Sequence, residues 1–103
     1  VMVPLNQNET YLDLLQVSPY PIILVVGMKL GCLNHALLTA AVLKQQGLKL
    51  VGWIANQIDP QMEYYPQNLA YLSQALDAPL IAEIPYQQAI QTTKFFTELF
   101  PCL

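Results

Sequence analysis

The chain has 103 residues, of which 54% are hydrophobic, and its formal net charge at pH 7 is −3. This length fits a single domain with a modest hydrophobic core. The high apolar content and the low charge exclude a disordered segment. Four Lys and Arg residues against seven Asp and Glu residues exclude the basic surface that binds nucleic acid.

The amino-terminal part of the chain contains no pattern typical of targeting or membrane insertion. Residues 1–20 have neither a basic start nor a cleavage pattern of small residues. The apolar stretch 21–43 is interrupted by Lys29, Asn34 and His35, whereas a membrane-spanning helix needs roughly 20 nearly continuous apolar residues. We therefore expect no membrane association.

The cysteine content indicates the redox compartment. Cys32 and Cys102 lack the paired spacing of a zinc site, and two cysteines are too few for a disulfide framework. We therefore expect a reducing environment and a cytoplasmic location.

Helical patterns and apolar runs alternate along the first half of the chain. Residues 9–16 predict a short helix, and the β-branched run 21–27 predicts a strand that is covered on both faces. After a turn, residues 34–46 predict a helix with apolar side chains at helical spacing, which Gly47 ends.

The second half continues this alternation. Residues 50–55 and 80–84 predict two more strands. Between them, residues 66–76 predict a helix that begins with Pro66, and residues 87–99 predict a weaker helix at the end.

Strand–helix units of this length form parallel crossovers, so the sequence predicts an α/β fold of three parallel strands with flanking helices. A parallel sheet needs both faces covered, and 103 residues supply barely enough helix for that. We therefore expect half of a larger sheet.

Ligands of open α/β sheets bind beyond the carboxyl ends of the strands. The segment from Gly31 to Asn34 lies there, where free backbone N–H groups at a helix start favour an anion. The alternative, which the residues alone favour, is an N-cap at Asn34 with Gly31 in a tight turn. The spacing of Gly27, Lys29 and Gly31 does not match a phosphate loop.

Other candidate residues each have a structural alternative. His35 is a possible base, but a capping or interface role is favoured. Cys32 at a helix start is a possible reactive thiol, but a packing role is favoured. Asn56 either binds the edge of a ligand or forms an Asx turn. Four further side chains line either a pocket or dimer seam, or simply a half-buried helix face: Met62, Tyr64, Tyr65 and Tyr71.

Three stretches share a specific order and spacing: PIILVVGMKLGCLNHALLT at 21–39, GWIAN at 52–56 and APLIAEIP at 78–85. Together they resemble the dethiobiotin synthetase family. The resemblance implies a three-layer fold of the P-loop NTPase type, of which residues 1–103 form the carboxyl-terminal part of a single domain. The phosphate loop, the Mg²⁺ ligands and the catalytic lysine are then expected before residue 1.

The resemblance implies an enzyme of biotin biosynthesis. With ATP and Mg²⁺, such an enzyme carboxylates 7,8-diaminononanoate with CO2 and closes the ureido ring, and it acts as a homodimer. This chain is expected to contribute binding surfaces, with no catalytic residue or metal ligand, and to be inactive alone. Two alternatives stay open: a non-enzymatic dimerisation module, and a P-loop ATPase of the amidotransferase or partitioning type.

The resemblance also assigns site residues. A substrate carboxylate, bound across the dimer interface, is expected at five residues beside the interface residue Lys29: Leu30, Gly31, Cys32, Leu33 and Asn34. The nucleotide base is expected at five others: Asn56, Gln57, Pro85, Tyr86 and Gln87. In two places the sequence departs from the family. Asn68 stands where a substrate-facing tyrosine is common, so Tyr65 or Tyr71 is the alternative, and Thr92 stands where an acidic nucleotide contact is expected.

Overall fold

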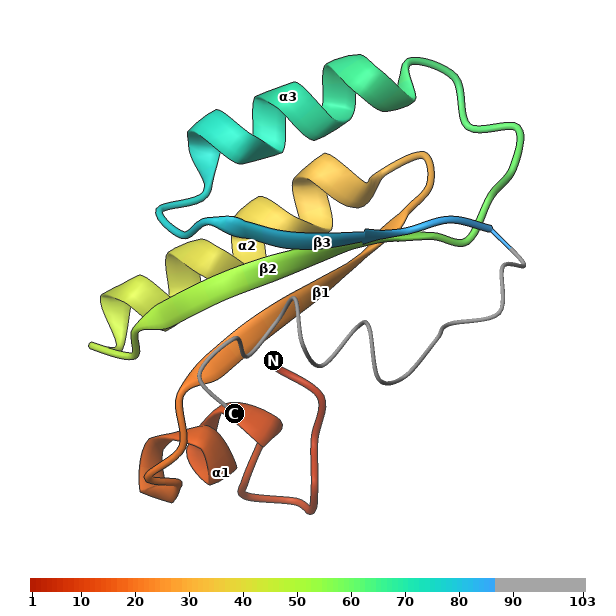
Figure 1. Ribbon diagram of the computed structural model, residues 1–103. Helices are drawn as coiled ribbons and strands as arrows, with labels where there is room; N and C mark the ends of the chain where they lie inside the picture. The colour runs from red at the N-terminus through yellow and green to blue at the C-terminus, as the bar shows by residue number, and fades with distance from the viewer. Residues whose placement is uncertain (87–103) are drawn as a thin grey trace, which may run out of the picture.

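The computed structural model of the protein describes residues 1–86. The predicted helix over residues 87–99, and with it Gln87 and Thr92, lies outside the described residues, as does Cys102. The described part contains six elements in chain order (Figure 1): α1 (Tyr11–Val17), β1 (Ile22–Met28), α2 (Cys32–Gln45), β2 (Leu50–Gln57), α3 (Tyr65–Ala75) and β3 (Leu80–Ile84).

The three strands form one parallel sheet in the order β1-β2-β3. Leu24 of β1 pairs with Trp53 of β2, which in turn pairs with Leu80 of β3. Helices α2 and α3 both cross above the same face of the sheet, as right-handed crossovers require when strand order follows chain order (Figure 1). The predicted parallel α/β class is therefore confirmed.

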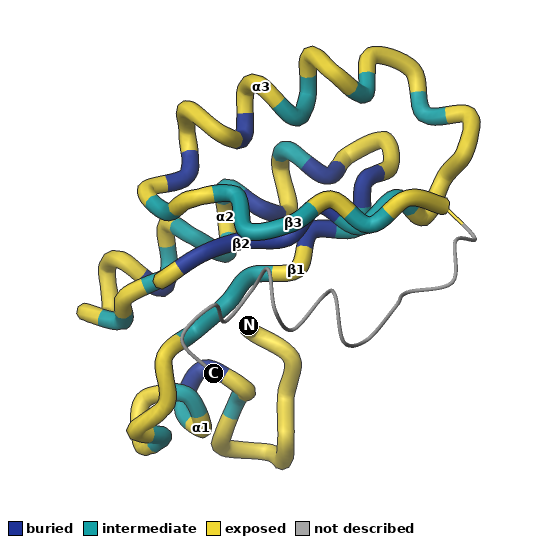
Figure 2. Tube along the Cα trace, in the orientation of Figure 1, coloured by how far each residue is buried: buried dark blue, intermediate teal, exposed yellow. Residues whose placement is uncertain are grey.

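The hydrophobic core lies between this face of the sheet and the two helices. Met28, Trp53 and Leu72 are completely buried there, and buried positions concentrate along β2 (Figure 2). Burial of each such side chain contributes roughly 1.5–3 kcal/mol to the free energy of unfolding. This packing holds the starts of α2 and α3 above the carboxyl ends of the strands.

The other face of the sheet is less covered within residues 1–86. Val25, in the middle of β1, is 56% exposed on that face. A Cβ atom at Gly52 would overlap the Ile81 side chain, so glycine there leaves room for Ile81 to lie across β2. The described residues thus form a sheet with one helix layer.

Two predicted boundaries are wrong at the carboxyl ends of the strands. β1 extends to Met28, and β2 extends to Gln57, because these two residues pair with each other across the sheet. Asn56 is therefore a strand residue and not part of an Asx turn.

The start of α2 also differs from the prediction. The helix begins at Cys32, and Gly31 is its N-cap with φ +91°, so Asn34 is the third helical residue and not the cap. No helix within residues 1–86 is long and apolar enough to cross a membrane.

Candidate functional site

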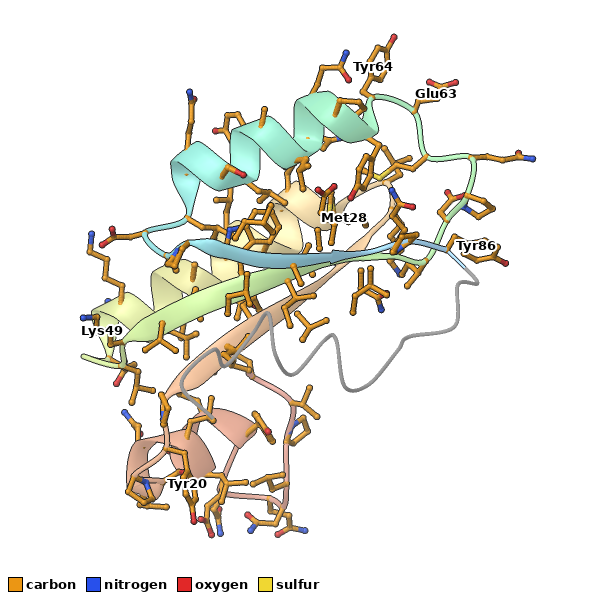
Figure 3. The ribbon with its side chains drawn as sticks, viewed as in Figure 1. Tyr20, Met28, Lys49, Glu63, Tyr64 and Tyr86 are labelled. Atoms are coloured by element: carbon orange, nitrogen blue, oxygen red, sulfur yellow. The ribbon has the colours of Figure 1, made fainter. Side chains whose placement is uncertain are left out.

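A groove of about 800 Å³ opens at the carboxyl ends of β1 and β2. One wall is the connection from β1 to α2, and the other is the connection from β2 to α3. Figure 3 shows Glu63, Tyr64 and Tyr86 at this end of the molecule and Lys49 at the opposite end. The groove is lined by residues 29–34 on the first wall, and by Asp59, Gln61, Met62, Glu63, Tyr64 and Asn68 on the second. All the residues expected at the substrate carboxylate thus line one cavity, with Lys29 beside them.

The start of α2 offers backbone donors to this groove. The N–H of Cys32 donates to the Lys29 carbonyl at 3.0 Å, and the N–H of His35 donates to the Gly31 carbonyl at 3.3 Å. Between them, the N–H groups of Leu33 and Asn34 donate to no protein acceptor within residues 1–86. A helix start with free N–H groups attracts an anion. The exposed Asn34 side chain adds a polar group at the same place.

Two other residues of this region have distinct environments. Cys32 is only 3% exposed and belongs to the core, which confirms the packing interpretation of this thiol. His35 is exposed and lines a separate hollow of about 290 Å³ beside β1, together with Lys29 and Thr39. Because its thiol is buried, Cys32 can offer the groove only its backbone. His35 does not line the groove.

The second wall is a loop that is fixed at both ends. At its start, the Asp59 carboxylate accepts the Gln61 N–H at 2.9 Å. At its end, Tyr64 adopts the left-handed conformation with φ +58°, and its carbonyl accepts the Asn68 N–H at 2.9 Å. The left-handed conformation costs a residue other than glycine roughly 1–2 kcal/mol. Such strain, in a residue that lines a cavity, is typical of functional sites.

The three tyrosines in and next to α3 have different environments. Tyr64 lines the groove at its rim and is 69% exposed. Tyr71 is 52% exposed and does not line the groove, and Tyr65 packs against the core. The two tyrosines offered as replacements for Asn68 are thus both turned elsewhere. The loop residues Asp59 and Glu63 are groove residues that the sequence analysis missed.

The residues expected around a nucleotide base gather at the ends of β2 and β3. Asn56 is half-buried and pairs with Gly27 on one side and Ile84 on the other. The Gln57 side-chain oxygen accepts the backbone N–H of Tyr86 at 3.3 Å. Pro85 and Tyr86 follow β3 and are exposed. The four described residues of this set therefore form one surface beside the groove.

A hydrogen bond between α3 and β3 lies next to that surface. The Tyr65 hydroxyl donates to the Glu83 carboxylate at 2.9 Å. Burial raises the pKa of Tyr65, and the bond to Glu83 and the charge of Glu83 raise it further, while the nearby Gln57 side chain lowers it. No sequence pattern predicted this contact, because it joins residues on either side of a helix and a turn.

The comparison with protein families identifies the chain. A family model described as an AAA domain matches residues 1–94. The chain belongs to this AAA domain family. The match agrees with the nucleotide-binding type of α/β fold that the resemblance implied.

Curated relatives of this AAA domain are ATP-dependent dethiobiotin synthetases. The protein of Nitrosospira multiformis is 47% identical over 87 residues, which are 84% of this chain and 38% of the relative. That of Baumannia cicadellinicola is 53% identical over 83 residues, 81% of this chain and 37% of the relative. That of Pseudoalteromonas translucida is 47% identical over 92 residues, which are 89% of this chain and 40% of the relative. The chain thus spans about two fifths of the length of these relatives.

Within residues 1–86, no group of three or more His, Cys, Asp and Glu side chains could hold a metal ion. The groove carboxylates Asp59 and Glu63 therefore contribute charge without forming a metal-binding set.

Proposed function

We propose that the protein is an ATP-dependent dethiobiotin synthetase. It carboxylates 7,8-diaminononanoate with CO2 and closes the ureido ring, as a step of biotin biosynthesis in the cytoplasm. Residues 1–103 are, in this proposal, the carboxyl-terminal part of a single P-loop-type domain. The observation that supports it most is the groove, since one cavity is lined by all the residues from Lys29 to Asn34 that the resemblance assigned to substrate binding.

The substrate carboxylate is proposed to lie at the start of α2. The free N–H groups of Leu33 and Asn34 and the side-chain amide of Asn34 are its donors. Lys29 adds a positive charge at the same wall. Leu30 is 94% exposed beside this site, and we propose that a second subunit covers it in a homodimer.

The nucleotide base is proposed to lie against the ends of β2 and β3. The Asn56 amide can both donate to and accept from a base edge. The backbone of Pro85, Tyr86 and Gln87 completes the pocket, of which Pro85 and Tyr86 are described and exposed.

The contribution of this chain to the reaction is positioning. Bound ATP with Mg²⁺ supplies the phosphoryl group that activates the carbamate. The chain's residues hold the substrate carboxylate and the base, and such positioning can lower a barrier substantially without any proton transfer by the chain.

An assay of Asn34→Ala in the full-length gene product tests the proposal. Loss of a hydrogen bond to a charged group predicts a KM for diaminononanoate that rises roughly 10-fold to 100-fold, while the KM for ATP stays unchanged. Gln45→Ala, at the exposed far end of the same helix, is the matched control. An unchanged KM for diaminononanoate removes Asn34 from the site. A wild-type protein that forms no dethiobiotin from ATP, CO2 and diaminononanoate contradicts the function itself.

A further inference from the structure

We propose that a second cavity, between the ends of α2 and α3, binds an aliphatic monocarboxylate, a ligand with an apolar chain and a single negative charge. This cavity has a volume of about 580 Å³ and lies beside the start of β2. The groove lies at the other end of α2, a helix of 14 residues that is roughly 20 Å long. The two share no lining residue, so this inference does not depend on the proposed function.

One side of the cavity is a single face of α2. Four residues of this helix line it, at the spacing that places side chains on one face: Leu37, Ala40, Ala41 and Lys44. The two alanines are small, and they leave space between this face and Ala75 at the end of α3. The cavity therefore exists because both helices carry alanine where they border it.

The end of α2 closes the cavity with an ordered turn. Gly47 follows the helix in the left-handed conformation, with φ +73°. Its N–H donates to the Lys44 carbonyl at 3.1 Å, and the Leu48 N–H donates to the Leu43 carbonyl at 2.9 Å. This pair of hydrogen bonds is the glycine-dependent cap that ends many helices. It fixes the connection to β2, from which Leu48 and Lys49 line the cavity.

The charges around the cavity favour an anion. The whole chain has only four Lys and Arg residues and a net charge of −3, yet both Lys44 and Lys49 line this cavity. Asp77 is the only acidic residue among its lining residues within the described part of the chain. Two ammonium groups and one carboxylate leave one net positive charge at pH 7. One carboxylate on the ligand balances that charge.

The rest of the lining favours an aliphatic chain. Leucine and alanine side chains make up most of it, and small-molecule sites typically combine an apolar lining with a few polar groups in a volume of about 300–1,000 Å³. A positive charge at the far end of the ligand would lose its hydration against these side chains, which is costly. A ligand without any charge would lose the attraction of the two lysines.

Three matched ligands test this chemistry on the full-length gene product. Isothermal titration calorimetry measures the Kd of octanoate, 8-aminooctanoate and 1-octanol, with diaminononanoate saturating and ATP absent. We expect octanoate to bind most tightly. The Kd of 1-octanol is expected to be roughly twofold to fivefold higher, as for the loss of an exposed ion pair. The Kd of 8-aminooctanoate is expected to be at least about fivefold higher.

Three variants test the location of the site. Lys44→Gln and Lys49→Gln are each expected to raise the Kd of octanoate roughly twofold to fivefold, because both side chains are exposed. Ala41→Leu fills the cavity from α2 and is expected to raise the Kd at least about fivefold. Leucine is a good helix former, so this exposed position tolerates it.

Two matched controls distinguish this cavity from the groove. Lys29→Gln removes the same charge from the groove, and Ala70→Leu makes the same enlargement on the exposed side of α3. Both are expected to keep the wild-type Kd of octanoate. If Lys29→Gln weakens octanoate binding while Lys44→Gln and Lys49→Gln do not, octanoate occupies the groove and the inference is wrong. A wild-type protein that binds no octanoate also overturns it, since the full-length chain then closes the cavity, and the proposed function is untouched.

Discussion

The two connections that form the walls of the groove enter their helices in different ways. Residues 29–31 join β1 to α2, and residues 58–64 join β2 to α3. Each connection ends with a residue in the left-handed conformation, at Gly31 with φ +91° and at Tyr64 with φ +58°. Glycine adopts this conformation freely, whereas a tyrosine does so at a cost of roughly 1–2 kcal/mol.

This difference shows that the conformation of the long wall, unlike that of the short wall, depends on contacts with its surroundings. The short wall needs only the backbone freedom of Gly31 to present the N–H groups of α2. The long wall holds Tyr64 in a strained conformation through the turn at Asp59 and the first hydrogen bond of α3. Strain of this kind persists only where neighbouring contacts enforce it.

Restricting the backbone of Gly31, in the short wall, is expected to change the free energy of unfolding most. A Cβ atom at Gly31 would meet no heavy atom within 4 Å, so a substitution there acts through the backbone alone. Gly31→Val is expected to lower the free energy of unfolding by about 1–2 kcal/mol, because a β-branched residue is strongly disfavoured in this conformation. Urea denaturation measures the change. Gly31→Asn, which tolerates the conformation better, is the control, and equal losses in both variants contradict the explanation.

Relieving the backbone strain at Tyr64, in the long wall, is expected to raise the free energy of unfolding, by a smaller amount. Tyr64→Gly is expected to raise the free energy of unfolding by about 0.5–1 kcal/mol, since glycine accepts the left-handed conformation but also gains freedom in the unfolded chain. Thermal denaturation detects this gain. Gln67→Gly, on the exposed first turn of the same helix, is expected to be destabilising by a similar amount. A loss of stability in Tyr64→Gly would show that its side chain contributes more than its strain removes.

The smallest expected effect is on the pH dependence of stability, and it comes from Tyr65, the neighbour of Tyr64. The pKa of Tyr65 is raised above 10.0 by burial and by Glu83, so folding favours its neutral form. The stability from this contact is fully present below about pH 10 and is lost as the pH rises through the raised pKa. Tyr65→Phe is expected to weaken the fall in melting temperature between about pH 9 and about pH 11. Tyr71→Phe should leave that fall unchanged, and identical curves for both variants would contradict the prediction.

The sequence predicted the elements of this fold well where the pattern is local. Strand β3 was predicted at its observed bounds, and α3 lies within one residue of its predicted range. Both segments are delimited by proline, whose effect on the backbone does not depend on distant residues. The parallel arrangement followed because strands alternate with helices.

The errors occurred where distant pairing sets the boundary. Met28 and Gln57 extend their strands because they pair with each other, and neither run of residues shows this alone. The helix starts at Cys32 because Gly31, in the left-handed conformation, is the N-cap and its carbonyl accepts the N–H of His35. Local patterns therefore place elements but not their ends.

The same distinction applies to the candidate site. The wall from Lys29 to Asn34 was predicted from the resemblance to the family, whereas the residues alone favoured a helix cap at Asn34. The opposite wall was predicted only in part, since Asp59 and Glu63 resemble ordinary solvated loop residues. The contact between Tyr65 and Glu83 was not predicted, because only the packing of α3 on the sheet brings them together.

The pairing pattern of the sheet has a consequence for how the protein folds. Leu24 pairs with Trp53, and Trp53 pairs with Leu80, so the two crossovers close loops of similar length. The entropy of loop closure grows only slowly with length, so neither crossover has an intrinsic advantage. Because chains emerge from the ribosome amino end first, we expect the first crossover to form before β3 is synthesised. During that interval β2 would present an unpaired apolar edge, which makes the nascent chain a target for chaperones at this stage.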